Sequence, residues 1–398
     1  MGGRTTYLPF IVAAALIFCY ATVTLPSTFT DDNPIRVVSD DLQRSDSRTI
    51  KAIYQFGDSI SDTGNFIRED PRSSFAKLPY GETFFHKPTG RCSDGLLMID
   101  YFAEFFKLPY LDPYLNKDGN FSHGVNFAVA GSTALNVSTL AQNNISYHAT
   151  NTSLFVQLDW FKSHLHSICS SASECKGKLA KALIMMGEIG GNDYNWAFFQ
   201  KMSITEIYKL VPEVVQAIKL AIKEVIKLGA IRIVVPGNFP IGCMTIYLNM
   251  FKTNDKSMYD DLQCLKDLNS FAEFHNNKLQ EAIKEVREDH LDVTIVYADY
   301  VSALQEVLQH ATSYGFDKDV MLNACCANCG TKGVPVCEDP YKRVSWDGVH
   351  LTQHAYQVMS QWLIKHTSVF NDNSSVKRLK FSFLFLIFSS LSTFISLG

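Results

Sequence analysis

The chain has few of the features that mark disordered, fibrous or nucleic-acid-binding proteins. Its 22 glycines and 13 prolines, spread over 398 residues, are too few for a collagen-like or low-complexity protein. Charged residues make up only 19% and hydrophobic residues 46%, which excludes disorder over most of the length and provides for a large core. The formal net charge is −4 and basic residues cluster only at Lys377, Arg378 and Lys380, so nucleic acid is not an expected partner.

Internal repeats, low-complexity linkers and one common hydrolase motif are also absent. Without a repeat or linker, the body of the chain reads as one domain, which we place at residues 49–368. Residues 25–48, rich in Asp, Ser, Thr and Pro, are predicted to form a loosely held leader. No Gly-x-Ser-x-Gly elbow occurs, which argues against an α/β-hydrolase.

Hydrophobic segments stand at both ends of the chain. Arg4 precedes 14 apolar residues, Tyr7 to Tyr20, a run that is short for about 30 Å of hydrocarbon. Small residues follow it, so we predict a cleaved secretory signal over residues 1–24, with a membrane anchor as the alternative. Residues 369–398 form a polar spacer and an apolar tail. This tail is a glycolipid-anchor signal, a tail anchor or an extension without function, and it is the one expected means of membrane attachment.

Glycosylation triplets agree with passage through the secretory pathway. Five Asn-x-Ser/Thr sequons are present, at Asn120, Asn136, Asn144, Asn151 and Asn373. The four between residues 120 and 153 predict an exposed, glycan-bearing region. We therefore expect a secreted protein, with the vacuole or the cell surface as further destinations.

The cysteine count predicts disulfides. Of ten cysteines, Cys19 falls in the predicted signal, so nine remain and at least one stays unpaired beside up to four bridges. Two pairs enclose loops, Cys169 with Cys175 and Cys243 with Cys264. Four more crowd one segment: Cys325, Cys326, Cys329 and Cys337. The pairing of these four cysteines is open. The spacing from Cys326 to Cys329 also fits half a zinc knuckle, but no second such pair follows, so we expect no metal.

Strand-like and helix-like patterns alternate along the body. Short apolar runs without strict polar alternation occur at residues 53–56, 125–129, 182–186, 231–235 and 293–297. Such runs are typical of parallel strands covered on both faces. Apolar residues repeat at helical spacing over residues 211–226, 271–286 and 351–364. The alternation predicts a three-layer α/β/α domain, with residues 67–118 as an insertion that covers one end of the sheet.

A serine directly follows the first predicted strand, in the segment FGDSISDTGN. Ligands of open parallel sheets bind beyond the carboxyl ends of the strands, which is where Ser59 lies. Gly57 permits a tight turn there. The alternative role for Ser59 is an ordinary helix N-cap.

Asp347 and His350 stand three residues apart in SWDGVHLT. A serine nucleophile needs an imidazole to take its proton and a carboxylate to fix the imidazole tautomer, and this spacing lets the two side chains meet within one turn. The alternatives are a surface or capping histidine, or a metal-binding pair of His350 with His354. No acidic third ligand stands at helical spacing, which argues against the metal.

Two further segments supply candidate donors for an oxyanion hole. Gly131 ends a strand in NFAVAGSTAL, and Asn192 follows another in GEIGGNDYN. A backbone amide and a side-chain amide are the groups that stabilise negative charge on an attacked carbonyl oxygen. Alternatively, the glycine is plain turn punctuation and the asparagine braces a loop.

These four segments, in this order, resemble the plant GDSL esterase/lipase family of the SGNH hydrolases over residues 51–366. The four residues for which that superfamily is named correspond to Ser59, Gly131, Asn192 and His350. The resemblance implies a flavodoxin-like sheet of about five parallel strands, a secreted glycoprotein and ester hydrolysis through an acyl-serine, without a cofactor. It also implies that Asp347 orients His350 and that the amides of Ser59 and Gly131, with the Asn192 side chain, bind the oxyanion. GEIGGNDYN and TFFHKPTGRCSDG look most like the subgroup with acetylajmalan and sinapine esterases.

We therefore predict a secreted esterase that acts on acetyl, other small or aromatic acyl esters of plant metabolites. An acyltransferase using the same acyl-enzyme and a non-catalytic binding protein stay open, because the sequence does not reveal water exclusion or acceptor binding. Candidates to line an acyl or ring pocket, or else to fill the core, are Phe84, Phe85, Trp196, Phe198 and Phe199. The oligomeric state is not predicted.

Overall fold

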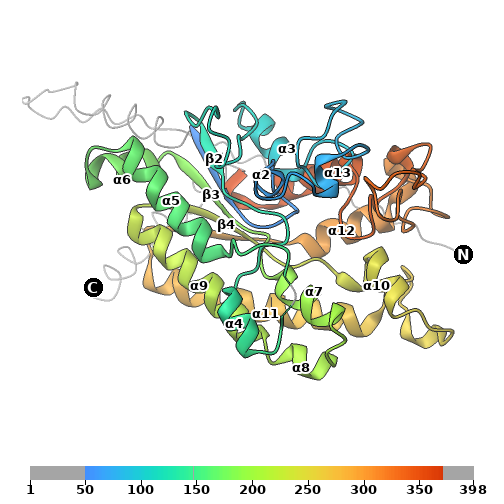
Figure 1. Ribbon diagram of the computed structural model, residues 1–398. Coiled ribbons are helices and arrows are strands. Elements are labelled where there is room, and N and C mark those ends of the chain that lie inside the picture. Colours follow the sequence, from blue (N-terminus) through green and yellow to red (C-terminus); the bar gives the residue numbers. More distant parts are fainter. Residues whose placement is uncertain (1–49, 147, 371–398) are drawn as a thin grey trace, which may run out of the picture. The chain divides into compact units, whose positions relative to one another are not determined.

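The computed structural model describes residues 50–146 and 148–370 (Figure 1). The predicted signal, the leader, the apolar tail from residue 371 and the sequon at Asn373 lie outside the described residues. Among the helices that are described, none is both long and apolar enough to cross a bilayer.

Five parallel strands form one sheet in the order β2-β1-β3-β4-β5, the order of flavodoxin-like folds. The strands are β1 (Ala52–Phe56), β2 (Gly124–Asn126), β3 (Ala182–Met186), β4 (Arg232–Pro236) and β5 (Thr294–Ala298). The predicted five-strand parallel α/β/α architecture is confirmed. Four strands lie within one residue of their predicted positions, but β2 is shorter than predicted. Phe127 and Val129 still donate to the carbonyls of Gln55 and Gly57, outside a regular ladder.

Twelve α-helices of the described residues surround this sheet. They are α2 (Phe66–Glu69), α3 (Met98–Phe105), α4 (Val137–Gln142), α5 (Leu154–Ile168), α6 (Ala172–Leu179), α7 (Gly191–Phe199), α8 (Ile204–Tyr208), α9 (Val211–Leu228), α10 (Thr245–Met250), α11 (Lys266–Asp289), α12 (Tyr300–Gln309) and α13 (Gln353–His366). Figure 1 shows α5, α9 and α11 on one face of the sheet and α3, α12 and α13 on the other. Because both faces are covered, every residue of β3 is buried.

The predicted helical patterns are present, with shifted bounds. The apolar stripe of α9 is buried, and the helix ends at Gly229, whose φ of 117° is the left-handed conformation common at helix ends. Helix α11 begins at Lys266, before the predicted residue 271. Helix α13 begins at Gln353 because the Thr352 hydroxyl caps it by accepting from the Ala355 amide.

The segment predicted as an insertion also contributes to the core. Its helix α3 packs against α13 and buries Met98, Ile99 and Phe102. The backbone of residues 112–114 pairs with Asn126 along the outer edge of β2. Part of residues 67–118 is therefore an integral layer of the domain.

Four disulfides join eight of the described cysteines, and the Cys92 thiol is free and buried. The bridges are Cys169–Cys175, Cys243–Cys264, Cys325–Cys337 and Cys326–Cys329. The predicted number of bridges and the unpaired thiol are thus confirmed. The zinc-knuckle interpretation of Cys326 and Cys329 is wrong, because these two sulfurs bond to each other.

Candidate active site

The loop after β1 is held by a glycine and a buried carboxylate. Gly57 has a φ of 146°, and a Cβ there would lie 2.7 Å from the Glu188 carbonyl oxygen, so a side chain would clash with the end of β3. The Asp62 carboxylate accepts hydrogen bonds from the amides of Gly64, Asn65, Phe66 and Ala130. The last of these ties the loop to the segment that leads into Gly131. Complete burial raises the pKa of Asp62 to about 6, although these amides favour its ionised form.

Ser59 lies in this loop at the carboxyl end of β1 and is only 7% exposed. It does not cap a helix, because α2 starts at Phe66 and the Asp62 carboxylate accepts from the Phe66 amide. The N-cap interpretation of Ser59 is therefore wrong. Within the described residues, neither its hydroxyl nor its backbone amide has a hydrogen-bond partner.

Asp347 and His350 meet as predicted. His350 Nδ1 lies 2.6 Å from Asp347 Oδ2, and the other carboxylate oxygen accepts from the amides of Val349 and His350 at 3.0 and 2.8 Å. Burial acts to raise the pKa of Asp347, but the charge and hydrogen bonds of His350 outweigh it and the pKa is lowered. Asp347 is thus held as a carboxylate, which accepts a hydrogen bond from a protonated Nδ1 of His350.

Two aromatic residues from residues 67–118 complete this arrangement. The Tyr80 hydroxyl donates to Asp347 Oδ2 at 2.8 Å. The Phe75 ring meets the His350 imidazole edge to face, with centroids 5.7 Å apart. Burial and the Asp347 charge raise the pKa of Tyr80, so that its hydroxyl keeps its proton. Neither residue was predicted at the site, and only the position of the segment, beside the end of the sheet, hinted at it.

The segment that holds the bridges Cys325–Cys337 and Cys326–Cys329 contacts the backbone just before Asp347. The amides of Cys325 and Cys326 donate to the carbonyls of Ser345 and Trp346 at 3.1 and 2.9 Å. The fully buried Trp346 indole packs with Tyr80 and the cysteines. The backbone just before Asp347 is therefore held by hydrogen bonds to a segment that two disulfides cross-link.

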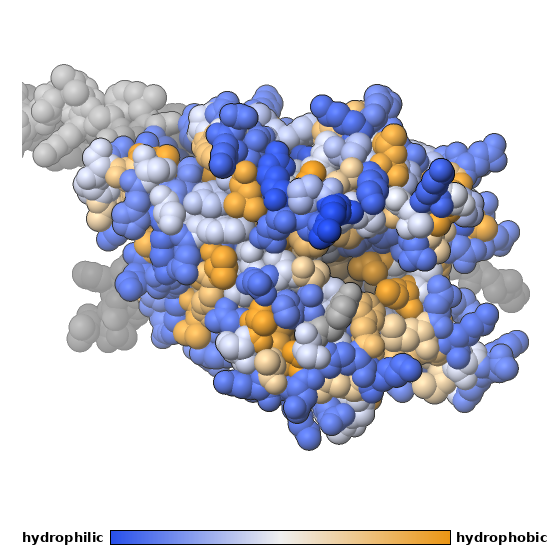
Figure 2. Space-filling model, viewed as in Figure 1, coloured by the Kyte–Doolittle hydropathy of each residue, from blue (hydrophilic) through white to orange (hydrophobic). Residues whose placement is uncertain are grey.

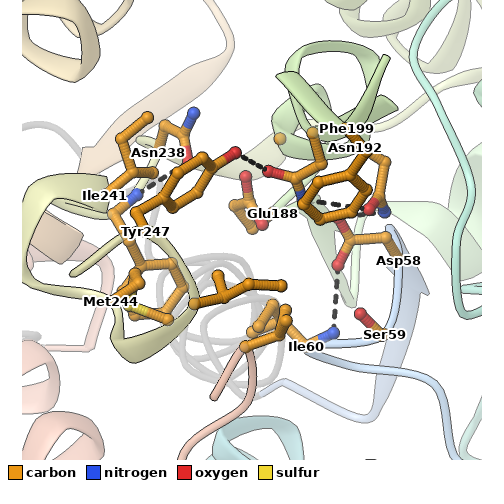
Figure 3. Close-up of a pocket in the computed structure, with 15 residues that line it drawn as sticks. Asp58, Ser59, Ile60, Glu188, Asn192, Phe199, Asn238, Ile241, Met244 and Tyr247 are labelled. Carbon is orange, nitrogen blue, oxygen red and sulfur yellow. Dashed lines mark hydrogen bonds between the residues drawn. The ribbon is translucent and has the colours of Figure 1, made fainter. Parts of the chain in front are cut away.

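A cavity at the carboxyl ends of β1, β3 and β4 brings several of these segments together (Figure 3). Its volume is about 40 Å³. Its walls are formed by Asp58, Ser59, Ile60, Glu188, Gly191, Asn192, Asn195, Phe199, Asn238, Phe239, Ile241, Met244, Ile246, Tyr247 and Val349. Figure 2 shows apolar side chains around a hollow beside α7 and α10, on a face that is otherwise mostly polar.

His350 approaches this cavity through its neighbour Val349, which lines it, and it interacts electrostatically with Asp58. Its Nε2 is buried and has no hydrogen-bond partner among the described residues. No hydrogen bond joins Ser59 to His350 in this structure, so the pair is not closed. Such contacts are often long in unliganded enzymes and tighten when substrate binds.

Of the predicted oxyanion donors Gly131 and Asn192, only Asn192 lines the cavity. Its Nδ2 donates to the Ser132 carbonyl at 3.0 Å and to Asp58 Oδ2 at 3.2 Å. Gly131 is not part of the cavity wall, and its φ of 84° and the nearby Ala149 Cβ, 2.6 Å from an added Cβ, exclude a side chain. Its backbone amide has no acceptor within the described residues.

Of the five aromatic candidates, only Phe199 lines the cavity. Phe198 is buried against Tyr247 and Phe271, and Trp196 lies beside Gly131. Phe84 and Phe85 contact each other away from the cavity. The pocket role assigned to these four is not supported by their positions.

The metal-binding alternative for His350 with His354 does not fit the structure. His354 Nδ1 bonds to the Tyr341 carbonyl oxygen at 2.8 Å, and its ring stacks on those of Tyr341 and Phe316. His350 instead faces Asp347. Within the described residues, no cluster of three metal-ligating side chains occurs.

Two carboxyl groups in the cavity wall were not recognised from the sequence. Asp58 and Glu188 are 2% and 4% exposed, and the Asp58 charge acts on Glu188. Asp58 stands in FGDSISDTGN and Glu188 in GEIGGNDYN. An acidic residue soon after each of two adjacent strands was therefore a signal that could have identified both. Their proximity follows from the side-by-side pairing of β1 and β3.

Comparisons with known proteins identify the family of this chain. The profile of the GDSL-like Lipase/Acylhydrolase family matches residues 53–363. A GDSL esterase/lipase of Arabidopsis thaliana is 46% identical over 336 residues, which cover 80% of this chain and 83% of that protein. Acetylajmalan esterase 1 of Rauvolfia serpentina is 43% identical over 327 residues, which cover 79% of this chain and 85% of that enzyme. The chain therefore belongs to the GDSL-like lipase/acylhydrolase family, whose members are carboxylic ester hydrolases.

Proposed function

We propose that the protein hydrolyses esters through an acyl-serine intermediate formed on Ser59. In this mechanism His350 Nε2 takes the hydroxyl proton as Ser59 Oγ bonds to the substrate carbonyl carbon. His350 then gives the proton to the departing alcohol, and water cleaves the acyl-serine in a second, equivalent cycle. The observation that carries the proposal is the 2.6 Å contact of His350 Nδ1 with Asp347, which leaves the buried Nε2 without a partner.

Negative charge on the carbonyl oxygen would be met by the amides of Ser59 and Gly131 and by the Asn192 side chain. Both backbone amides have no acceptor within the described residues, which supports this role. Asn192 already uses both Nδ2 protons, so it would exchange its longer bond, to Asp58, for the oxyanion. Losing one such donor typically costs about 10²- to 10³-fold in turnover.

We propose an acetyl or similarly small acyl group as the acyl part of the substrate. The cavity beside Ser59 is small, at about 40 Å³, and this size favours a small acyl group. The similarity to acetylajmalan esterase 1 supports an acetyl ester of a plant metabolite. The apolar surface around the hollow would then contact the alcohol part of the ester.

We also propose that the protein is a secreted glycoprotein. Asn120, Asn136, Asn144 and Asn151 are all exposed, which glycan attachment requires. Four disulfides support an oxidising compartment. Attachment at the cell surface would depend on the apolar tail.

The direct test is turnover of p-nitrophenyl acetate by wild type and by Ser59→Ala. We expect the variant to lose activity while its circular dichroism spectrum is unchanged. Ser61→Ala is the matched control, because it removes a neighbouring buried hydroxyl of the same loop, and it is expected to keep most of the wild-type rate. A Ser59→Ala variant that keeps the rate would disprove the assignment.

A further inference from the structure

The cavity wall holds a pair of acidic side chains that the proposed mechanism does not use. Asp58 and Glu188 follow the adjacent strands β1 and β3, and the Asp58 amide donates to the Glu188 carbonyl oxygen at 3.2 Å. Their carboxyl groups are within hydrogen-bonding reach of each other, and both are almost fully buried. Figure 3 shows Glu188 between Asn238 and Asp58, with Ser59 and Asn192 on the Asp58 side.

One member of the pair is well satisfied as a carboxylate and the other is not. Asp58 Oδ1 accepts from the Ile60 amide at 3.0 Å, and Oδ2 accepts from Asn192 Nδ2 at 3.2 Å. Glu188 Oε1 is buried without a hydrogen-bond partner among the described residues, and the Gly191 amide is the one donor that acts to lower the pKa of Glu188. The donors thus favour a charge on Asp58 and a proton on Glu188.

The surroundings do not compensate two negative charges. Within the described residues, no lysine or arginine lines the cavity. Titratable groups that interact with the pair come from each neighbouring element: Asp62, Cys92, Asp193, Tyr194, Tyr300, His350 and Tyr356. Burial and the Asp58 charge raise the pKa of Glu188, and burial also raises that of Asp58. Two adjacent buried carboxyl groups without a cation hold one proton between them.

We propose that Glu188 is a positioning residue for Asn192 and acts through Asp58: the two carboxyl groups share one proton, so that one negative charge faces the Asn192 amide instead of two. This inference rests on the proposed function, in which Asn192 donates to the oxyanion. With one charge, shared between the Ile60 amide and the Glu188 proton, Asp58 orients the Asn192 amide but still releases an N–H to the substrate. A second charge would retain that N–H and repel the oxyanion.

Substitutions at Glu188 separate this role from mere packing. Glu188→Gln keeps a donor to Asp58 and cannot ionise, so kcat at neutral pH is expected within about threefold of wild type. Glu188→Ala removes the donor, and kcat is expected to fall at least about tenfold with little change in KM, since the loss affects the transition state.

The pH dependence of kcat distinguishes this role from a purely structural one, because a residue that only packs would not change it. As pH rises, Glu188 of wild type gives up its proton and two carboxylates face Asn192, so kcat is expected to fall on the alkaline side. Glu188→Gln is expected to lack this fall. The exposed Glu281→Gln on α11 removes a carboxyl group of the same type elsewhere and should keep the wild-type profile.

Infrared difference spectra, wild type minus Glu188→Gln at neutral pH, test the shared proton without relying on turnover. The carbonyl band of a protonated carboxylic acid is expected in wild type and absent from the variant. An absent band, an unchanged alkaline limb in Glu188→Gln, or a Glu188→Ala kcat equal to wild type would overturn the inference. Wild-type turnover by Ser59→Ala would instead disprove the proposed function. That result is distinguishable, because it does not depend on the Glu188 variants or on the infrared band.

Discussion

The His350 imidazole and the Asp347 carboxylate lie 2.6 Å apart, Nδ1 to Oδ2, and their side chains are only 6% and 8% exposed. Water therefore has little access to either partner, and the hydrogen bond fixes the ring with Nε2 as its free nitrogen. Tyr80 and two backbone amides hold the carboxylate in turn. These hydrogen bonds position the pair, and this arrangement leads to four predictions.

Asp347→Asn is expected to lower kcat about 10²- to 10⁴-fold toward p-nitrophenyl acetate. An amide in place of the carboxylate no longer selects the imidazole tautomer with a proton on Nδ1. Asp339→Asn, a change of the same kind at a more exposed turn before this loop, should leave kcat near wild type. Equal rates for wild type and Asp347→Asn would contradict the assigned role.

Asp347 also gives stability a defined dependence on pH. Its pKa in the folded protein is lowered, so protonation favours unfolding, and its contribution is present above the unfolded pKa of about 3.9. The contribution disappears as pH falls through the folded pKa. In urea unfolding, the free-energy difference between wild type and Asp347→Asn should be constant above about pH 5 and shrink below about pH 4. A difference that grows toward acid pH would refute this.

Tyr80→Phe removes the hydroxyl that donates to Asp347 but keeps the ring that packs on Trp346 and Phe75. Losing a hydrogen bond to a charged group costs about 1.5–3 kcal/mol, so we expect the free energy of unfolding to fall by that amount. We expect kcat to fall about tenfold with KM unchanged, because the looser carboxylate orients His350 less well. A change confined to KM would place Tyr80 in substrate binding instead.

The bridge between Cys325 and Cys337 is expected to matter for turnover as well as for stability. Replacing both cysteines by serine should lower the free energy of unfolding by about 2–3 kcal/mol, the usual contribution of a short-loop disulfide. It should also lower kcat, since Cys325 holds the Ser345 carbonyl just before Asp347. The matched control replaces Cys169, which directly follows α5, and Cys175, which lies in α6. If both double variants lose the same fraction of kcat, the bridge has no special link to the site.

Much of the fold could be predicted from local sequence. The buried strands stand out as continuous apolar runs because both sheet faces are covered, and α9 is recognisable from its spacing and from Gly229. Short β2 was overestimated because residues beyond Asn126 are equally apolar but leave the regular ladder. Helix α3 was missed within an aromatic-rich, proline-containing stretch.

The site could be predicted only where its partners are near in sequence or fall in recognisable segments. Asp347 and His350 are three residues apart, so their contact follows from local geometry. Tyr80 reaches Asp347 across 267 residues, and the cysteine pairing depends on how one crowded loop folds. The contact of Asp58 with Glu188 depends on β1 and β3 being neighbours. These contacts arise from tertiary structure, and no local pattern specifies them.

The most direct test of the account is covalent labelling by a serine-reactive fluorophosphonate, followed by peptide mass spectrometry. One adduct per chain is expected, on the peptide that contains Ser59, and it should be lost in Ser59→Ala and in His350→Ala. An unlabelled Ser59 in a protein that still hydrolyses esters, or an adduct on another serine, would contradict it.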